Sequence, residues 1–181
     1  VLNLSAPTAL ADVGASQTDL VVNGQDWTGA TGSTSPTGWS IYTGVPIYTI
    51  INDGGDHTTA LKIEINADSN PDVRQIVSCE IGKTYRVSFD AKFVSGSYLG
   101  LRVGTGMATI DAYYSNDVTG ATWATYTTSD FIATTTSIFV YAFINGSTGG
   151  YNSYIDNVTL TQIGEVFAID ANNSSTTTAY D

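Results

Sequence analysis

The sequence predicts an all-β protein, a two-sheet antiparallel β-sandwich of the jelly-roll kind. Composition is the first observation: 42% of the 181 residues are hydrophobic and only 13% are charged, while Thr, Ser, Gly and Asn recur throughout. The second is a series of short alternating segments bounded by Gly, Asn, Asp, Ser or Pro, as strands and turns require. The third is that no long amphipathic helix pattern and no internal repeat is evident. Regular spacing of this kind is typical of sandwiches and jelly rolls.

The length fits one domain with a tail at each end. Residues 1–18 lack a clean period and are predicted to form an N-terminal arm or linker. The sandwich is predicted over residues 19–164, and the polar, low-complexity residues 165–181 are predicted to be a C-terminal linker or tail. Because the chain begins at Val1 rather than Met, we expect that a signal, a pro-segment or a larger polypeptide has been trimmed away.

Ten strands are expected in the sandwich. In chain order they are residues 19–23, 39–50, 59–66, 73–79, 83–94, 98–103, 108–114, 121–132, 135–145 and 152–163. The clearest is KTYRVSFDAKFV, which should place Tyr85, Val87, Phe89, Ala91 and Phe93 in the core and Arg86, Ser88, Asp90 and Lys92 in solvent.

The segment SIFVYAFING is apolar on both faces of the strand that it predicts. Its aliphatic face can fill the space between the sheets, and its other face carries Phe139, Tyr141 and Phe143. Two interpretations of these rings stay open. A loop or the N-terminal arm covers them, or they form a platform on which sugar rings pack their C–H faces.

Charge and motifs narrow the classes of function. The net charge of −11 argues against a nucleic-acid partner, because such binding depends on Lys and Arg. No apolar run approaches the roughly 20 residues needed to span a bilayer, and Cys79 has no second cysteine to pair with. With one His and one Cys most catalytic pairs cannot be assembled, so we predict that the chain is not an enzyme. A glycosidase-type pair among its seventeen acidic residues stays open.

Three stretches together resemble a known family. They are LVVNGQDWTG at 20–29 with Gly38–Trp39, then GKTYRVSFDAK at 82–92, and finally TWATYTTSDFIA, SIFVYAF and YIDNVTLTQ. In this order they are similar to carbohydrate-binding modules of the cellulose- and xylan-binding type, families 4, 9, 16 and 22. The resemblance covers residues 19–163. It implies a galactose-binding-like jelly roll without catalytic activity that binds glycan in a concave face or at loop tips.

The resemblance also implies a structural calcium ion, bound where the opening and closing strands of such modules meet. Asp26 and Asp156 are the matching ligands here, but Thr28 stands where the family has Glu, which predicts a weak or empty site. Loop carboxylates and carbonyls are the ligands that Ca²⁺ prefers, and the chain has many of both. Without a metal, Asp156 is expected to accept backbone N–H bonds that offset its burial.

Candidate glycan-binding residues follow from the strand faces. Those predicted are Tyr98, Arg102, Tyr113, Tyr141 and Phe143, with Arg86 or Asp90 hydrogen-bonding to sugar hydroxyls. Trp39 and Trp123 are expected in the core or at a corner of the sandwich.

Two functions are weighed. In the first, the chain is a non-catalytic module that recognises a polysaccharide or surface glycan and holds a secreted enzyme near its substrate. In the second, it is a structural or adhesive domain of a virion (phage tail, fibre or capsid-associated) or of a cell-surface protein, which the tail STTTAYD favours somewhat. Both place the chain outside the cell, on a cell surface or on a virion, and both leave open neighbouring domains or a homo-oligomer.

Overall fold

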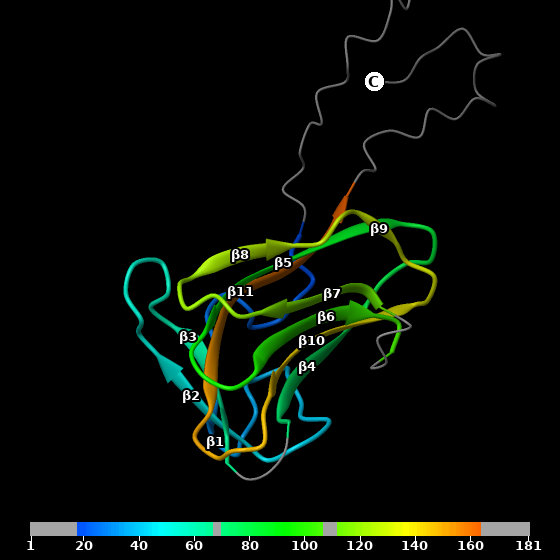
Figure 1. Ribbon diagram of the computed structural model, residues 1–181. Helices are drawn as coiled ribbons and strands as arrows, with labels where there is room; N and C mark the ends of the chain where they lie inside the picture. The colour runs from blue at the N-terminus through cyan, green and yellow to red at the C-terminus, as the bar shows by residue number, and fades with distance from the viewer. Residues whose placement is uncertain (1–17, 67–69, 107–111, 164–181) are drawn as a thin grey trace, which may run out of the picture.

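The computed structural model describes residues 18–66, 70–106 and 112–163, which form two antiparallel sheets (Figure 1). The predicted all-β sandwich is confirmed, and no helix occurs among these residues. The strands are β1 (Thr31–Gly32), β2 (Pro46–Ile51), β3 (Ala60–Ile65), β4 (Asp72–Ser78), β5 (Thr84–Phe93), β6 (Tyr98–Gly104), β7 (Ala112–Val118), β8 (Ala124–Thr127), β9 (Phe131–Ile132), β10 (Ser137–Asn145) and β11 (Asn152–Ile163).

The larger sheet has the order β1-β2-β3-β11-β5-β8, with β9 also paired to β5, and the smaller sheet has the order β4-β10-β6-β7. Figure 1 shows β5, β8 and β11 in one layer and β4, β6, β7 and β10 in the other. The last strand therefore lies inside its sheet, between β3 and β5. The opening segment runs beside it, because Leu20 N–H donates to Leu160 O and Val158 N–H donates to Gly24 O, at 2.9 and 2.8 Å. This confirms the predicted meeting of the two ends of the domain.

The core is formed by the inward faces of both sheets. Strand alternation places Tyr85, Val87, Phe89 and Ala91 inside, as predicted, whereas Phe93 is only partly buried. Trp27 and Trp39 pack against each other in this core, with ring centroids 4.9 Å apart. The expectation for Trp39 is thus confirmed.

Four predicted strands differ from the structure. Residues 19–21 have no regular structure and residues 22–26 form bends, and Asn23 has a φ of 56°, which interrupts extended pairing. The strand predicted at 39–50 is extended only from β2 onward, after the turn at Gly44, whose φ is +79°. The segment 121–132 is split into β8 and β9, because Thr128 leaves the ladder and bonds to Val87 through both its N–H and its side chain.

The strand predicted at 108–114 appears as β7, later in the chain, and residues 108–111 lie outside the described residues. The predicted arm (1–18) and tail (165–181) also lie outside them, apart from Thr18. In the part of the chain that the structure describes, no helix is long and apolar enough to cross a membrane.

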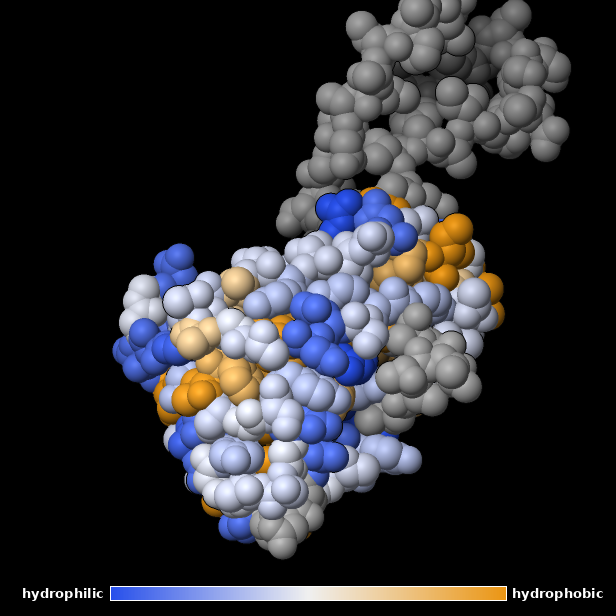
Figure 2. Space-filling model, viewed as in Figure 1, coloured by the Kyte–Doolittle hydropathy of each residue, from blue (hydrophilic) through white to orange (hydrophobic). Residues whose placement is uncertain are grey.

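Most of the surface in Figure 2 is polar, and hydrophobic residues gather near the end of the molecule where β9 lies. Ile132 in β9 and Ile81 before β5 are both largely exposed.

Candidate functional site

Strand β10 presents aromatic rings on the outer face of the smaller sheet. Its aliphatic residues point into the core and are nearly inaccessible, so alternation turns Phe139, Tyr141 and Phe143 outward. Since β10 lies between β4 and β6, these rings occupy the middle of the face. We call the outward residues on and beside these strands the aromatic face; they are Tyr42, Arg74, Tyr98, Arg102, Phe139, Tyr141 and Phe143.

Tyr141 is flanked by two arginines. It lies directly opposite Arg74 on β4 and Arg102 on β6. The packed neighbours leave Tyr141 only 6% exposed, and this burial raises the pKa of its phenol, although the nearby charge of Arg102 acts in the other direction.

Phe143 lies over a glycine. It is opposite Gly100 on β6, where an added Cβ would be 2.3 Å from Cε1 of the ring. Tyr98 meets this ring edge-on at 5.9 Å between centroids, and Tyr141 stacks beside it at 6.2 Å. The missing side chain at Gly100 therefore allows three rings to form a continuous array.

Arg102 packs against this array. Its guanidinium lies 5.0 Å from the centroid of the Phe143 ring, and Arg102 is 5% exposed. It donates to Leu101 O, Asn116 O and the Asp117 carboxylate, at 3.0, 2.7 and 2.5 Å. Its Nε has no hydrogen-bond partner among the described residues. Because three of its N–H donors are already bonded within the protein, the main contribution of Arg102 is to hold the Phe143 ring in place.

Arg74 is the more available cation. Its guanidinium lies 4.6 Å from the Tyr42 ring and 5.9 Å from the Phe139 ring, and Tyr42 is 57% exposed. Its Nε donates to the Ser40 hydroxyl at 3.4 Å. Within the described residues no carboxylate forms an ion pair with it. A partly exposed guanidinium between two rings can donate to a carboxylate or to neighbouring hydroxyls.

The structure brings together four of the seven predicted glycan-binding residues: Tyr98, Arg102, Tyr141 and Phe143. Tyr113 instead stacks on Phe131 at 4.4 Å, with its hydroxyl bonded to Thr134. Arg86 and Asp90 lie on the outer face of the larger sheet, where Arg86 pairs with Asp130 at 2.7 Å and Asp90 accepts from Thr125 and Asn157. These three do not join the aromatic face.

Sequence reasoning missed Arg74 and Tyr42. The alternation of DVRQIVS would have placed Arg74 on the same face as Ile76, opposite the buried Val73 and Val77. Tyr42 precedes β2 and carries no periodic signal.

A pocket opens at one end of the aromatic face. It has a volume of about 420 Å³ and is lined by Asn70, Ser97, Asn145, Gly146, Ser147, Thr148 and Tyr151. The side-chain amide of Asn145 donates to the hydroxyl of Tyr98 at 3.1 Å, so the pocket adjoins the ring array.

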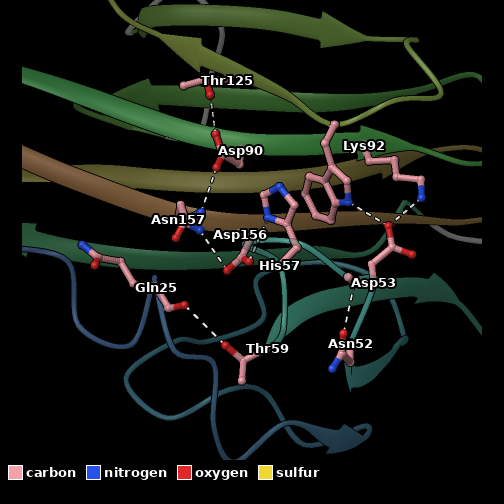
Figure 3. Close-up of polar contacts among 12 residues, drawn as sticks. Gln25, Asn52, Asp53, His57, Thr59, Asp90, Lys92, Thr125, Asp156 and Asn157 are labelled. Carbon is pink, nitrogen blue, oxygen red and sulfur yellow. Dashed lines mark hydrogen bonds and ion pairs between the residues drawn. The ribbon is translucent and has the colours of Figure 1, made fainter.

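The outer face of the larger sheet carries a closed polar network (Figure 3). Asp156 is 1% exposed, and its Oδ2 lies 3.1 Å from His57 Nδ1 while its Oδ1 accepts from Asn157 N–H. Burial raises the pKa of the Asp156 carboxyl, which these two partners only partly oppose. His57 belongs to the loop between β2 and β3 and stacks on Trp123 at 3.8 Å. Trp123 thus covers an outer face and is not in the core.

The same loop is fastened at a second point. Asp53 accepts from Trp123 Nε1 at 2.7 Å and from Lys92 Nζ at 2.6 Å. These bonds hold the pKa of the Asp53 carboxyl below its usual value, with Lys92 as the main cause. The loop is therefore fixed across the sheet by two carboxylates.

The residues around Asp156 do not fit a calcium ion. Asp26 is exposed, and the groups bonded to Asp156 are an imidazole and a backbone N–H, neither of which is an oxygen ligand. Within residues 18–66, 70–106 and 112–163, no cluster of three or more His, Cys, Asp or Glu side chains could hold a metal. The Asp156 carboxylate accepts one backbone N–H bond, from Asn157.

Comparison with known proteins places this geometry in a structural class. No family model and no curated protein matches the sequence. Among solved structures, a family 4 carbohydrate-binding module (CBM4) matches with a TM-score of 0.54 and 18% identity, over 79% of this chain and 99% of that one. A family 61 module (TmCBM61), solved in complex with β-1,4-galactotriose, matches with a TM-score of 0.57 and 16% identity, over 81% and 99%. The chain has the fold of a carbohydrate-binding module.

This module fold also occurs within a much longer phage protein. The enzymatically active domain of bacteriophage CBA120 tailspike protein 4 matches with a TM-score of 0.59 and 20% identity, over 80% of this chain. The match spans 21% of the tailspike chain.

Proposed function

We infer that this chain is a non-catalytic carbohydrate-binding module that recognises a polysaccharide or surface glycan on its aromatic face. The observation that carries the inference is the continuous array of Tyr98, Phe143 and Tyr141 on the outer face of the smaller sheet, in which Tyr98 and Phe143 are partly exposed and Tyr141 packs beside them. Sugar rings have apolar C–H faces, and packing them on aromatic planes gives affinity without charge. The module fold and the galactotriose complex of a structure with that fold support this assignment.

The array is held in place before any ligand arrives. Gly100 provides room for Phe143, and the Arg102 guanidinium packs against that ring while bonding to two backbone carbonyls. Preorganised rings lose little conformational freedom on binding, which improves the affinity of a shallow site.

The carboxylates near the aromatic face support a binding role over hydrolysis. Asp72 is buried and accepts from Tyr42 and Thr43 N–H, and burial raises the pKa of its carboxyl. Asp117 is paired with Arg102. Glycosidases need two carboxyl groups facing the scissile bond, and both of these are committed to structural contacts.

Binding to a panel of soluble polysaccharides, measured by affinity gel electrophoresis and then by calorimetry, tests the proposal. Replacing Tyr141 or Phe143 by Ala is expected to weaken binding about tenfold or more. Trp123→Ala is the matched control, because it removes a larger ring from the opposite face. Equal loss in all three variants, or wild-type protein that binds no glycan, would contradict the proposal.

A second candidate is a structural or adhesive domain of a virion or cell surface, outside the cell in either case. The likeness to part of a phage tailspike favours it. A spacer would bind no glycan and would show its role in assembly, so the mass of the protein in solution by light scattering, and its association with particles, are the measurements that separate the two.

A further inference from the structure

The pocket beside the aromatic face is built from three loops that are tied to one another. Ser97 N–H donates to Asn145 O at 2.8 Å, and Gly146 N–H donates to the side chain of Asn70 at 2.9 Å. Gly150 N–H donates to Ile65 O at 2.8 Å. These bonds join the β3–β4, β5–β6 and β10–β11 loops, so the pocket is present before a ligand binds.

Tyr151 forms an aromatic wall whose position is fixed by glycines. A Cβ added at Gly146 would lie 2.8 Å from Cδ2 of the Tyr151 ring, and one added at Gly96 would lie 3.7 Å from the same atom. Gly96 also has a φ of +122°, a conformation that other residues rarely adopt. The ring therefore packs against Gly146 more closely than a side chain there would allow, whereas its distance from Gly96 is that of an ordinary contact.

The lining has the chemistry of a site for an uncharged, hydroxyl-rich ligand. Its side chains are two amides, three aliphatic hydroxyls and the phenol of Tyr151, and none of the lining residues carries a charge. Amides and hydroxyls both donate and accept hydrogen bonds, as sugar hydroxyls do. The volume of about 420 Å³ lies near the lower end of the range for small-ligand pockets, about 300–1,000 Å³, which suits a short ligand better than a long chain.

The pocket continues the aromatic face. Asn145 ends β10 on the outward side and bonds to the hydroxyl of Tyr98, whose ring meets Phe143. A glycan lying on the rings would thus reach the pocket with its next residue. The Oδ1 atom of Asn145 can accept from that residue while its amide stays bonded to Tyr98.

We propose that this pocket is a separate subsite that takes the end residue of an uncharged glycan whose following residues lie on the aromatic face. This inference rests on the proposed function, because the remaining residues of the glycan are taken to bind on the aromatic face. The module then recognises chain ends, and not only chain interiors.

The test uses the glycan that binds best in the panel and compares two blocking variants. Ser147→Tyr fills the pocket from an exposed loop position, and Thr58→Tyr makes the same change in the exposed β2–β3 loop. Ser147→Tyr is expected to weaken binding at least tenfold, measured by calorimetry, and Thr58→Tyr is expected to bind as wild type. Asn145→Ala, which removes the amide, should weaken binding in the same direction.

Competition by chain length adds an independent readout. At equal mass concentration, short oligosaccharides should displace the bound glycan better than the long polysaccharide, because they present more ends. If Ser147→Tyr binds as wild type and chain length has no effect while Phe143→Ala still weakens binding, the pocket inference is overturned and the proposed function stands. If no glycan binds the wild type at all, both fall.

Discussion

The two outer faces of this sandwich both carry aromatic rings and basic side chains, but these groups have different partners on each face. On the larger sheet, Trp123 is stacked by His57, and the Lys92 ammonium is paired with Asp53, so a loop closes over the strands. On the smaller sheet, the Phe143 ring is partly exposed beside Tyr98, and Arg74 contacts aromatic rings and forms no ion pair with a carboxylate among the described residues. The polar groups of the larger sheet's outer face therefore pair with one another, and the face proposed to bind glycan is the one whose arginine Arg74 has no such ion pair among the described residues.

Burial explains why the closed face needs its partners. Asp156 is almost inaccessible, and a buried carboxylate without hydrogen bonds is strongly unfavourable. Its contact with His57 and the Asn157 N–H supplies them. The open face carries no comparable requirement at Phe139 or Tyr42, which remain in contact with solvent.

The largest expected effect is on the closed face. His57→Ala removes the side chain that bonds Asp156 and stacks on Trp123, so we expect the free energy of unfolding to fall by about 3 kcal/mol, as for other broken buried pairs. Urea denaturation measures this, and calorimetry should show unchanged glycan affinity. His57→Gln, which keeps an amide donor, should retain part of the stability. If His57→Ala lost glycan affinity while keeping full stability, the binding site would lie on the outer face of the larger sheet and not on the aromatic face.

The next effect is on the open face, at Gly100. An added methyl group would overlap the Phe143 ring, so Gly100→Ala should displace the ring and lower stability by about 1–3 kcal/mol, the usual result of overpacking. Glycan affinity should fall with it. At Gly120 an added Cβ meets only the Tyr126 hydroxyl at 3.8 Å, so Gly120→Ala is the control expected to leave affinity unchanged. Similar binding by both variants would argue against a role for Phe143.

Arg74→Gln tests whether the Arg74 guanidinium contributes to glycan affinity. Loss of one hydrogen-bonding group to the ligand should lower affinity about threefold to tenfold, with stability unchanged within about 0.5 kcal/mol. Arg86→Gln on the opposite face breaks the ion pair with Asp130 and should bind as wild type. A steep loss of affinity with added salt in the wild type but not in Arg74→Gln would indicate an acidic sugar.

The pH dependence of stability sharpens the comparison for Asp156. Burial raises the pKa of the Asp156 carboxyl above the ordinary 3.8, so the folded protein keeps this proton at pH values where the unfolded chain has lost it. The resulting contribution to stability is fully present below pH 3.8 and is lost as the pH rises through the folded pKa. Asp156→Asn does not titrate, so its stability relative to wild type should improve as the pH rises above 3.8. Urea denaturation across that range checks the slope, and parallel curves would contradict it.

The alternation of apolar and polar residues predicted most of the strands. It could not predict contacts between side chains that lie far apart in the sequence. The two-sided apolar pattern of residues 138–144 correctly indicated a strand with its aliphatic residues in the core and its rings on the other face, whereas its place between β4 and β6 was not predicted. The partner of Asp156 could not be read in the same way, because His57 is 99 positions away in a loop without periodicity. Likewise, Arg86 and Arg102 both alternate outward from a strand, and only the sheet order separates their faces.

The smallest effect is expected from calcium, which the family resemblance predicted and the geometry does not favour. An ion at a hundred times its dissociation constant stabilises a protein by about 2.7 kcal/mol, which for a chain of this size raises the melting temperature by roughly 5–10 °C. Because His57 occupies the Asp156 carboxylate, we expect no shift with excess Ca²⁺ or with chelator, measured by differential scanning calorimetry. A rise that disappears in Asp26→Asn would instead assign Asp26 to a metal site, and would mean that the histidine gives way to the ion.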